Sequence, residues 1–290
     1  MEVKYAVIPC AGKGTRFLPI TKGVAKELCP IIDRPTLDFI VEECIDGGCT
    51  DIVFIVSKDK EDIKKFYSRD LEFEKFLIDN GKKEQAEMIK QIAEKARFHY
   101  VIQEEQLGLG HAVLQAKKVI GDNNFVVCCG DDIAMYDGVS PVKQLIDCFV
   151  ENGGHTVVGG KKVDHNMINK YGCMDLKEQI SERAFKLKGI VEKPKLEEAP
   201  SDYASLGKWV FNGRIFDYLE KTPRGTGNEI QLTDAIALEM KDHDVYYYDF
   251  DGTRYDCGDK FGYITAIIYT ALKREEFRDK LKAYLKSLDL

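Results

Sequence analysis

A glycine-rich loop near the start of the chain contains the first residues whose types and spacing could do chemistry. Gly12 and Gly14 follow a short apolar run, and the cations Arg16 and Lys26 come after them. Glycines let backbone N–H groups approach a phosphate closely, and an arginine can donate two parallel hydrogen bonds to phosphate oxygens. The loop is neither a P-loop nor a dinucleotide fingerprint, because Phe17 stands where that fingerprint needs its third glycine. It therefore predicts a phosphate site of another kind, or an ordinary turn with surface lysines.

Carboxylates follow two other apolar runs. Asp131 and Asp132 come directly after Gly130 and the apolar segment 125–129, and Asp256 follows a second strand-like run. Mg²⁺ prefers hard oxygen ligands, and paired carboxylates at a strand end are a frequent way to hold it. The alternative is that these aspartates cap a turn.

Two further segments add groups that could bind an organic ligand. In the run QEEQLGLGH, residues 103–111, the amide of Gln103 offers a donor and an acceptor that suit the edge of a uracil or thymine. In the triplet Glu192-Lys193-Pro194, the carboxylate could accept hydrogen bonds from sugar hydroxyls and the ammonium could meet a phosphate. Each segment alone also has a plain interpretation, as a glycine turn before a helix or as a common surface triplet.

An alternation of short apolar runs and amphipathic segments must position these residues. Strands are expected at 5–9, 51–56, 99–103, 125–129 and 156–160, and helices at 35–49, 108–118 and 141–152. Beyond residue 160 strands dominate, at 189–191, 208–211 and 245–250, with helices at 230–240 and 261–288. This order predicts an α/β fold, with a Rossmann-like, mixed and mostly parallel central sheet and helices on both faces. Ligands bind at the carboxyl ends of the strands in such sheets.

The pattern favours one main domain with two helical additions. The densely charged segment 58–97 has helical periodicity and predicts two helices inserted between strands. The α/β catalytic domain is expected over 1–260. The helices of 261–290 are expected to pack on it or on a partner subunit.

Charge and cysteine content exclude several classes of protein. The net charge is −7, from 42 basic and 49 acidic residues, which argues against nucleic acid or a membrane surface as a partner. The first 30 residues nevertheless carry a net charge of +3, which is compatible with a local anion site. The nine cysteines form no CxxC pair and show no zinc spacing, which favours reduced thiols in the cytoplasm. No apolar run approaches the roughly 20 residues that span a bilayer.

Taken together, the motifs resemble one known family. The run GKGTRFLPITKGVAKELCP over 12–30 resembles the signature GxGTRxLPxTKxxPKExLP of sugar-1-phosphate nucleotidyltransferases, and more narrowly that of the bacterial UTP–glucose-1-phosphate uridylyltransferases. The likeness continues in order through GLGHAV at 108–113, YG at 171–172, VEKP at 191–194, EIQLTDA at 229–235 and DCG at 256–258. Two positions depart from the family. Ala25 replaces a usual proline, which is expected to loosen the loop that holds Lys26, and Asn228 replaces a frequent aspartate.

This resemblance implies roles for the residues singled out above. Arg16, Lys26 and Lys193 would be catalytic, the first two holding a triphosphate and the third a sugar phosphate. The nucleotide would contact Ala11, Gly12, Gly14, Thr15, Glu27, Gln103 and Gly108. The sugar would contact Asp132, Gly172, Glu192 and Lys193, and Mg²⁺ would be held by Asp131 and Asp256.

The implied reaction is attack by a glucose 1-phosphate oxygen on the α-phosphorus of UTP, which gives UDP-glucose and releases pyrophosphate. The attacking phosphate is already an anion at neutral pH, because its second pKa is about 6, so no general base is needed. Cations and positioning should carry the catalysis. The alternatives are a sister enzyme that uses dTTP or CTP, and a catalytically inactive paralogue that binds a sugar nucleotide. The resemblance also implies a homodimer or homotetramer.

Overall fold

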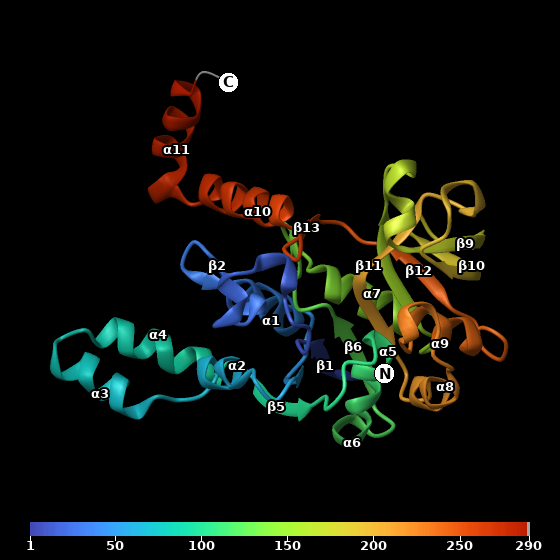
Figure 1. Cartoon of the computed structure of the whole chain (residues 1–290), viewed down its shortest axis with the longest axis horizontal. Coiled ribbons are helices and arrows are strands. Elements are labelled where there is room, and N and C mark those ends of the chain that lie inside the picture. Colours follow the sequence, from blue (N-terminus) through green and yellow to red (C-terminus); the bar gives the residue numbers. More distant parts are fainter. Residues whose placement is uncertain (289–290) are drawn as a thin grey trace.

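A nine-stranded mixed sheet forms the centre of the computed structural model, which describes residues 1–288 (Figure 1). The last two residues of the predicted segment 261–290 lie outside the described residues. The strands lie in the order β5 (Arg97–Ile102), β4 (Asp51–Val56), β1 (Val3–Pro9), β6 (Asn124–Cys128), β11 (Tyr203–Phe211), β8 (Val157–Lys162), β12 (Tyr246–Asp249), β10 (Ala184–Glu192) and β9 (Gly172–Gln179). Seven of them run in one direction, and β11 and β10 run in the other. The predicted mixed, mostly parallel sheet is confirmed.

Helices cover both faces of this sheet. One face packs against α1 (Thr36–Asp46), α2 (Glu61–Phe66) and α7 (Pro141–Glu151), and the other against α5 (Leu109–Gln115), α6 (Lys117–Ile120), α8 (Ile215–Lys221) and α9 (Leu232–Glu239). Neighbouring side chains of β1 alternate between the two layers, with Ala6 and Ile8 buried on the first face and Val7 on the second. A strand covered on both faces needs apolar residues at every position, which explains the continuous apolar runs in the sequence.

Two helical extensions leave the body of the molecule (Figure 1). Helices α3 (Leu71–Asp79) and α4 (Lys83–Glu94) form an arm that extends beyond α2. This insert was expected to contain two helices and contains three, because the side chain of Asp70 accepts a hydrogen bond from Phe73 N and starts a new helix. Near the other terminus, α10 (Lys260–Lys273) packs on the core through Ala266, and α11 (Glu275–Ser287) extends away from it. None of the helices described in residues 1–288 is long and apolar enough to cross a membrane.

Two small antiparallel pairs complete the structure. A short hairpin joins β2 (Pro30–Ile31) to β3 (Arg34–Pro35), and β7 (Asp132–Met135) pairs with β13 (Thr253–Asp256). The second pairing sets Asp256 opposite Asp132. It therefore brings together the two carboxylate motifs, which are far apart in the sequence.

The carboxyl ends of β1, β5 and β6 point to the same edge of the sheet, because these strands are parallel to one another through β4. The glycine-rich loop follows β1, Gln103 follows β5 and Asp131 comes soon after β6. The fold therefore collects three motifs at one edge, as expected for an open α/β sheet.

Candidate active site

The glycine-rich loop and the turn that carries Lys26 contact the two segments that contain the predicted metal ligands. Gly14 has a φ of +62°, a left-handed conformation that favours glycine. Arg16 Nη1 donates to the carbonyl of Gly258 over 3.1 Å, and Lys26 Nζ forms a 2.5 Å ion pair with Asp131 Oδ2. Burial alone would lower the pKa of Lys26, but the neighbouring charge of Asp131 raises it above its usual value. The lysine is therefore a cation at neutral pH.

Three adjoining hollows surround this loop, and we name each by one residue that lines it. The Gln103 hollow has a volume of about 270 Å³, the Thr15 hollow about 190 Å³ and the Glu192 hollow about 260 Å³. Their residues come from elements that are distant in the sequence. The nine-stranded sheet and the β7–β13 pair bring these elements to a common edge.

A carboxylate and two cations lie where the hollows meet. Asp131 lines all three hollows, Lys26 lines the Gln103 and Thr15 hollows, and Arg16 lines the Thr15 and Glu192 hollows. The other residues predicted from the sequence line them as well. The Gln103 hollow includes Ala11, Gly12, Glu27, Gln103 and Gly108, the Thr15 hollow includes Gly14 and Thr15, and the Glu192 hollow includes Asp132, Gly172, Glu192, Lys193 and Asp256.

The Gln103 hollow is lined by an amide that is held in place. Gln103 is only 3% exposed, and its Nε2 lies 2.9 Å from His111 Nδ1. Gly108 has a φ of +100°, and a Cβ there would come within 2.9 Å of the carbonyl oxygen of Ile230. The same carbonyl accepts a 2.9 Å hydrogen bond from Gly110 N. The EIQLTDA segment thus packs directly on the second glycine loop, and its closeness requires glycine at position 108.

The Glu192 hollow has a carboxylate that is already oriented. Glu192 Oε2 accepts a hydrogen bond from Thr233 Oγ1 at 3.0 Å, and Glu192 Oε1 lies 3.3 Å from Lys193 Nζ. Gly172 allows this arrangement, because a Cβ there would lie 3.0 Å from Thr233 Cγ2 and 3.3 Å from Glu192 Oε2. The YG, VEKP and EIQLTDA motifs therefore meet at one wall of this hollow.

The two carboxylates predicted to bind Mg²⁺ converge on Gly258. A Cβ at this glycine would lie 2.5 Å from Asp131 Oδ2 and 3.1 Å from Asp256 Oδ1. Two hard oxygen donors beside a small space fit Mg²⁺, which usually keeps water or phosphate oxygens as its remaining ligands. Within residues 1–288, no group of three or more His, Cys, Asp and Glu side chains could hold a metal ion. The fit therefore depends on such outside ligands.

Asp132 has different partners from its neighbour Asp131. Arg254 Nε donates to both carboxylate oxygens of Asp132, at 3.0 and 2.8 Å, and Lys208 Nζ donates to the Asp132 carbonyl at 3.2 Å. Burial raises the pKa of Asp132, and the charges of Arg254 and Lys208 oppose that rise. The Arg254 guanidinium also lies 5.3 Å from the centre of the Tyr171 ring, so it forms part of the Glu192 hollow. Sequence reasoning missed this arginine, and its place two residues before the DCG motif is the signal that could have found it.

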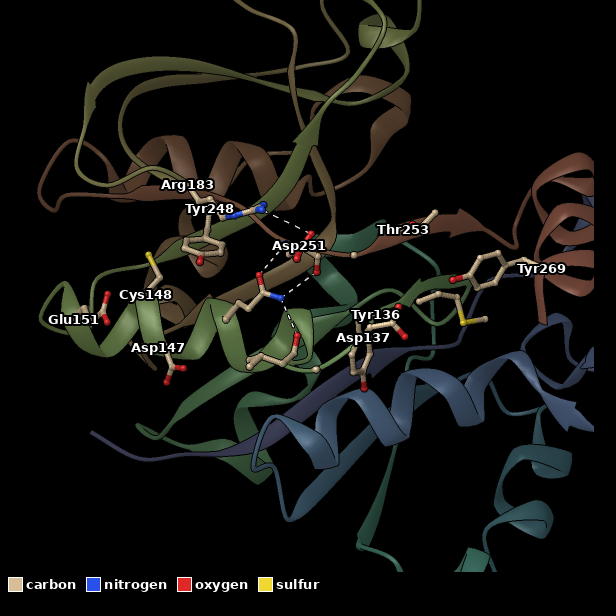
Figure 2. Close-up of a pocket in the computed structure, with 15 residues that line it drawn as sticks. Tyr136, Asp137, Asp147, Cys148, Glu151, Arg183, Tyr248, Asp251, Thr253 and Tyr269 are labelled. Carbon is tan, nitrogen blue, oxygen red and sulfur yellow. Dashed lines mark hydrogen bonds and ion pairs between the residues drawn. The ribbon is translucent and has the colours of Figure 1, made fainter. Parts of the chain in front are cut away.

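A larger hollow, of about 780 Å³, lies between α7 and the strands β12 and β13 (Figure 2). Asp147 and Glu151 of α7, together with Asp137 and Asp251, give it an acidic lining, and Arg183 lies 3.8 Å from Asp251. None of the residues predicted for the site lines it. The largest of these hollows is therefore not the candidate active site. The cations, the buried amide and the converging carboxylates all line the three smaller hollows.

The chain matches known proteins over nearly its whole length. A family model described as nucleotidyl transferase matches residues 5–271. A UTP–glucose-1-phosphate uridylyltransferase of Staphylococcus epidermidis is 43% identical over 289 residues, which cover 100% of this chain and 99% of the relative. A solved structure of a UTP-bound UGPase from Acinetobacter baumannii is 33% identical, with a TM-score of 0.91, and covers 99% of this chain and 100% of that one. A structure of a UDP-glucose pyrophosphorylase complexed with UDP-glucose is 34% identical, with a TM-score of 0.86, and covers 94% and 100%.

These comparisons agree with the resemblance carried by the motifs, which is thereby confirmed. The relatives resemble this chain in both sequence and fold, and the matched regions include the strands and helices that form the three hollows. This chain belongs to the nucleotidyl transferase family.

Proposed function

We propose that this chain transfers the uridylyl group of UTP to glucose 1-phosphate, giving UDP-glucose and pyrophosphate. The observation that carries the proposal is the position of Asp131, which lines hollows of different chemistry, with Arg16 and Lys26 beside it. The Gln103 hollow offers an amide for a pyrimidine edge, and the Glu192 hollow offers a carboxylate and an ammonium for a sugar phosphate. The relatives support it, since one is named for this reaction and two solved structures hold UTP and UDP-glucose.

We call the Gln103 and Thr15 hollows the nucleotide half of the site and the Glu192 hollow the sugar half. In the sugar half, Glu192 accepts hydrogen bonds from sugar hydroxyls with its preoriented carboxylate. Asp132 and Gly172 complete the wall that faces the sugar. In the nucleotide half, Gly12 and Gly14 let the backbone approach the nucleotide.

The reaction must bring two anions together, so its main demand is neutralisation of charge. The sugar phosphate attacks the α-phosphorus as an anion, without a general base. Lys193 holds that phosphate against repulsion, and Arg16 and Lys26 stabilise the charge that grows on the leaving pyrophosphate. Lys26 reaches the phosphates by exchanging its ion pair with Asp131 for phosphate oxygens.

Mg²⁺ is the proposed cofactor, with Asp131 and Asp256 as its protein ligands. When bound, it would supply positive charge that offsets the negative charge of the two substrates. Exchange of the Lys26 ion pair frees the Asp131 carboxylate for this role. The lack of a side chain at Gly258 keeps the space between the two carboxylates open.

Pyrophosphate release with different nucleotides tests the proposal. The intact chain is given glucose 1-phosphate and Mg²⁺ together with UTP, dTTP, CTP or ATP in turn. A reaction with UTP but without glucose 1-phosphate is the control. We expect pyrophosphate release with UTP, and much slower release with the other nucleotides. Faster release with dTTP or CTP would assign the chain to a sister activity, and no release with any nucleotide would favour an inactive paralogue.

A homodimer or homotetramer is also proposed, with a catalytic domain over 1–260 and the C-terminal helices as the contact. Phe277 and Tyr284 of α11 line an apolar hollow of about 400 Å³ beside Ile32. Exposed apolar surface of this kind often marks a subunit contact. Light scattering should give an oligomer for the wild type and a smaller mass for Tyr284→Glu, and a monomeric wild type would refute the contact.

The cytoplasm is the proposed location. All nine cysteines are free thiols, and eight of them are buried. Such thiols are typical of a reducing compartment.

A further inference from the structure

The loop that carries Lys26 is held on both sides of that residue by the start of the helical insert. On one side, the backbone N–H of Ala25 donates to Asp62 Oδ2 at 2.8 Å. On the other side, Glu27 Oε2 forms a 2.7 Å ion pair with Lys60 Nζ. Lys60 directly precedes α2, and Asp62 lies in the first turn of that helix. Two contacts from one short segment thus flank the lysine.

The Glu27–Lys60 pair is buried, whereas Asp62 is half-buried. Glu27 is 1% exposed and Lys60 is 8% exposed, and removing either partner would leave a buried charge without compensation. Ala25 is also buried, and the short turn Lys26–Leu28 that it precedes has no side-chain cap of its own. Asp62 supplies an acceptor to the Ala25 N–H at the start of this turn from a different element. The residue that precedes the turn therefore takes its backbone acceptor from α2.

The backbone position of Lys26 decides where its ammonium can reach. Its Nζ contacts Asp131 at the junction of the three hollows. A shift of the Ala25–Glu27 backbone would move that ammonium relative to a bound triphosphate. A misplacement of about 1 Å at a reacting centre can cost about 100-fold in rate.

We propose that Asp62 and Lys60 are positioning residues for Lys26, so that the start of α2 sets the geometry of the triphosphate contact. This inference rests on the proposed function, in which Lys26 stabilises charge on the leaving pyrophosphate. It gives the insert a part in catalysis, although its arm of α3 and α4 lies far from the sheet edge that forms the site (Figure 1).

The backbone at Ala25 offers a way to separate positioning from other effects. Its φ is −58° and its ψ is 135°, close to the fixed φ of about −65° that proline imposes. Proline has no N–H, so it needs no acceptor there, and it stands at this position in the signature that the chain resembles. Ala25→Pro should therefore hold the turn without help from Asp62.

The test measures kcat, and KM for each substrate, in a set of matched variants. Asp62→Ala should lower kcat about tenfold and leave KM for glucose 1-phosphate unchanged. Asp62→Asn keeps an acceptor for the Ala25 N–H and should stay near the wild-type kcat. Glu61→Ala, the control, removes an exposed carboxylate from the same turn and should have no effect.

Rescue is the decisive comparison. Adding Ala25→Pro to Asp62→Ala should recover most of the lost kcat, which a general loss of stability would not predict. Wild-type kcat in Asp62→Ala, or a loss that Ala25→Pro does not restore, overturns the proposal. Lys60→Met tests the other contact if Asp62→Ala folds poorly by circular dichroism, and a folded Lys60→Met with wild-type kcat overturns it as well.

The same assay separates this inference from the proposed function. A wild-type chain that releases no pyrophosphate from UTP counts against the function. An active wild type with an unaffected Asp62→Ala counts against positioning alone.

Discussion

The nucleotide half and the sugar half of the site hold their polar groups in different ways. In the nucleotide half, Lys26 and Asp131 pair with each other across the junction of the hollows. In the sugar half, Glu192 is held by Thr233, a residue of the wall behind it. Both partners of the first contact, Lys26 and Asp131, are proposed to bind a ligand. The second contact joins a ligand-binding group to a support, which holds Glu192 Oε2 independently of the 3.3 Å contact between Glu192 Oε1 and Lys193.

The difference follows from the backbone that carries each half. Loops after β1 and β6 carry the nucleotide half, whereas the ends of β9 and β10 carry much of the sugar half. The Lys26–Asp131 contact must break when the triphosphate binds, because both residues are proposed to bind ligands. The Glu192–Thr233 contact can persist, because Thr233 only supports Glu192. We therefore expect variants of the nucleotide half to lose turnover and variants of the sugar half to lose affinity for the sugar phosphate.

The largest effect is expected at the residue that all three hollows share. Asp131→Asn keeps the shape of the side chain but removes its charge, and should lower kcat about 1,000-fold. Calorimetry should still detect glucose 1-phosphate binding, because Glu192 and Lys193, the groups proposed to hold the sugar phosphate, are unchanged. Asp137→Asn, an exposed aspartate beyond β7, is the matched control. Full activity of Asp131→Asn at ordinary Mg²⁺ concentrations would remove Asp131 from the mechanism.

The next effect is expected for the lysine of the nucleotide half. Lys26→Ala should lower kcat about 100-fold, because one charge no longer stabilises the leaving pyrophosphate. Its thermal unfolding should change little, since the ammonium lies at the edge of the hollows. Lys22→Ala, at an exposed position of the same segment, is the control. A Lys26→Ala variant with nearly wild-type turnover would end this assignment.

A smaller and different effect is expected in the sugar half. Glu192→Gln is isosteric but loses the charge that accepts hydroxyl hydrogen bonds, and should raise KM for glucose 1-phosphate about tenfold. KM for UTP should stay unchanged, and Glu197→Gln at an exposed neighbouring position should be silent. Initial rates against both substrates measure this. A change in KM for UTP instead would break the division into two halves.

No effect on catalysis is expected at the opposite edge of the sheet, where β4 begins. Hydrogen bonds from Arg97, and then from His99 and Thr50, lower the pKa of Asp51. Because the pKa of Asp51 is lower in the folded protein, its ionised form stabilises the fold at pH values above the unfolded pKa of about 3.9. This stability is lost as the pH falls below that pKa.

Asp51→Asn should therefore lower the free energy of unfolding at pH 7 by about 1–3 kcal/mol. It should also flatten the fall in stability towards acid pH. Urea unfolding at several pH values measures both quantities. An unchanged pH dependence would show that Asp51 does not contribute in this way, and altered kinetic constants would show that the two edges are coupled.

Hydrophobic pattern predicted much of the fold. β4 covers the expected 51–56, and α7 ends one residue before the expected 152. The pattern missed β9 and α8. β9 begins buried and ends exposed, so it shows no sustained alternation, and α8 has only seven residues, too few for a clear helical period.

The motifs predicted residues that line the three hollows, and the roles of these residues stay predictions. Residues that follow strand ends were found, because the fold class alone brings such ends together. Their supports were not found: Thr233, Arg254, Lys60 and Asp62 contact partners 33 to 122 residues away in the chain. Such contacts form only when distant segments meet in the folded protein, which no local pattern encodes.

A crystal structure of the chain with bound UTP tests the central comparison most directly. We predict that Lys26 Nζ has left Asp131 and contacts phosphate oxygens, while Glu192 and Thr233 keep their 3.0 Å hydrogen bond. An intact Lys26–Asp131 pair, with the triphosphate bound away from both residues, would contradict it.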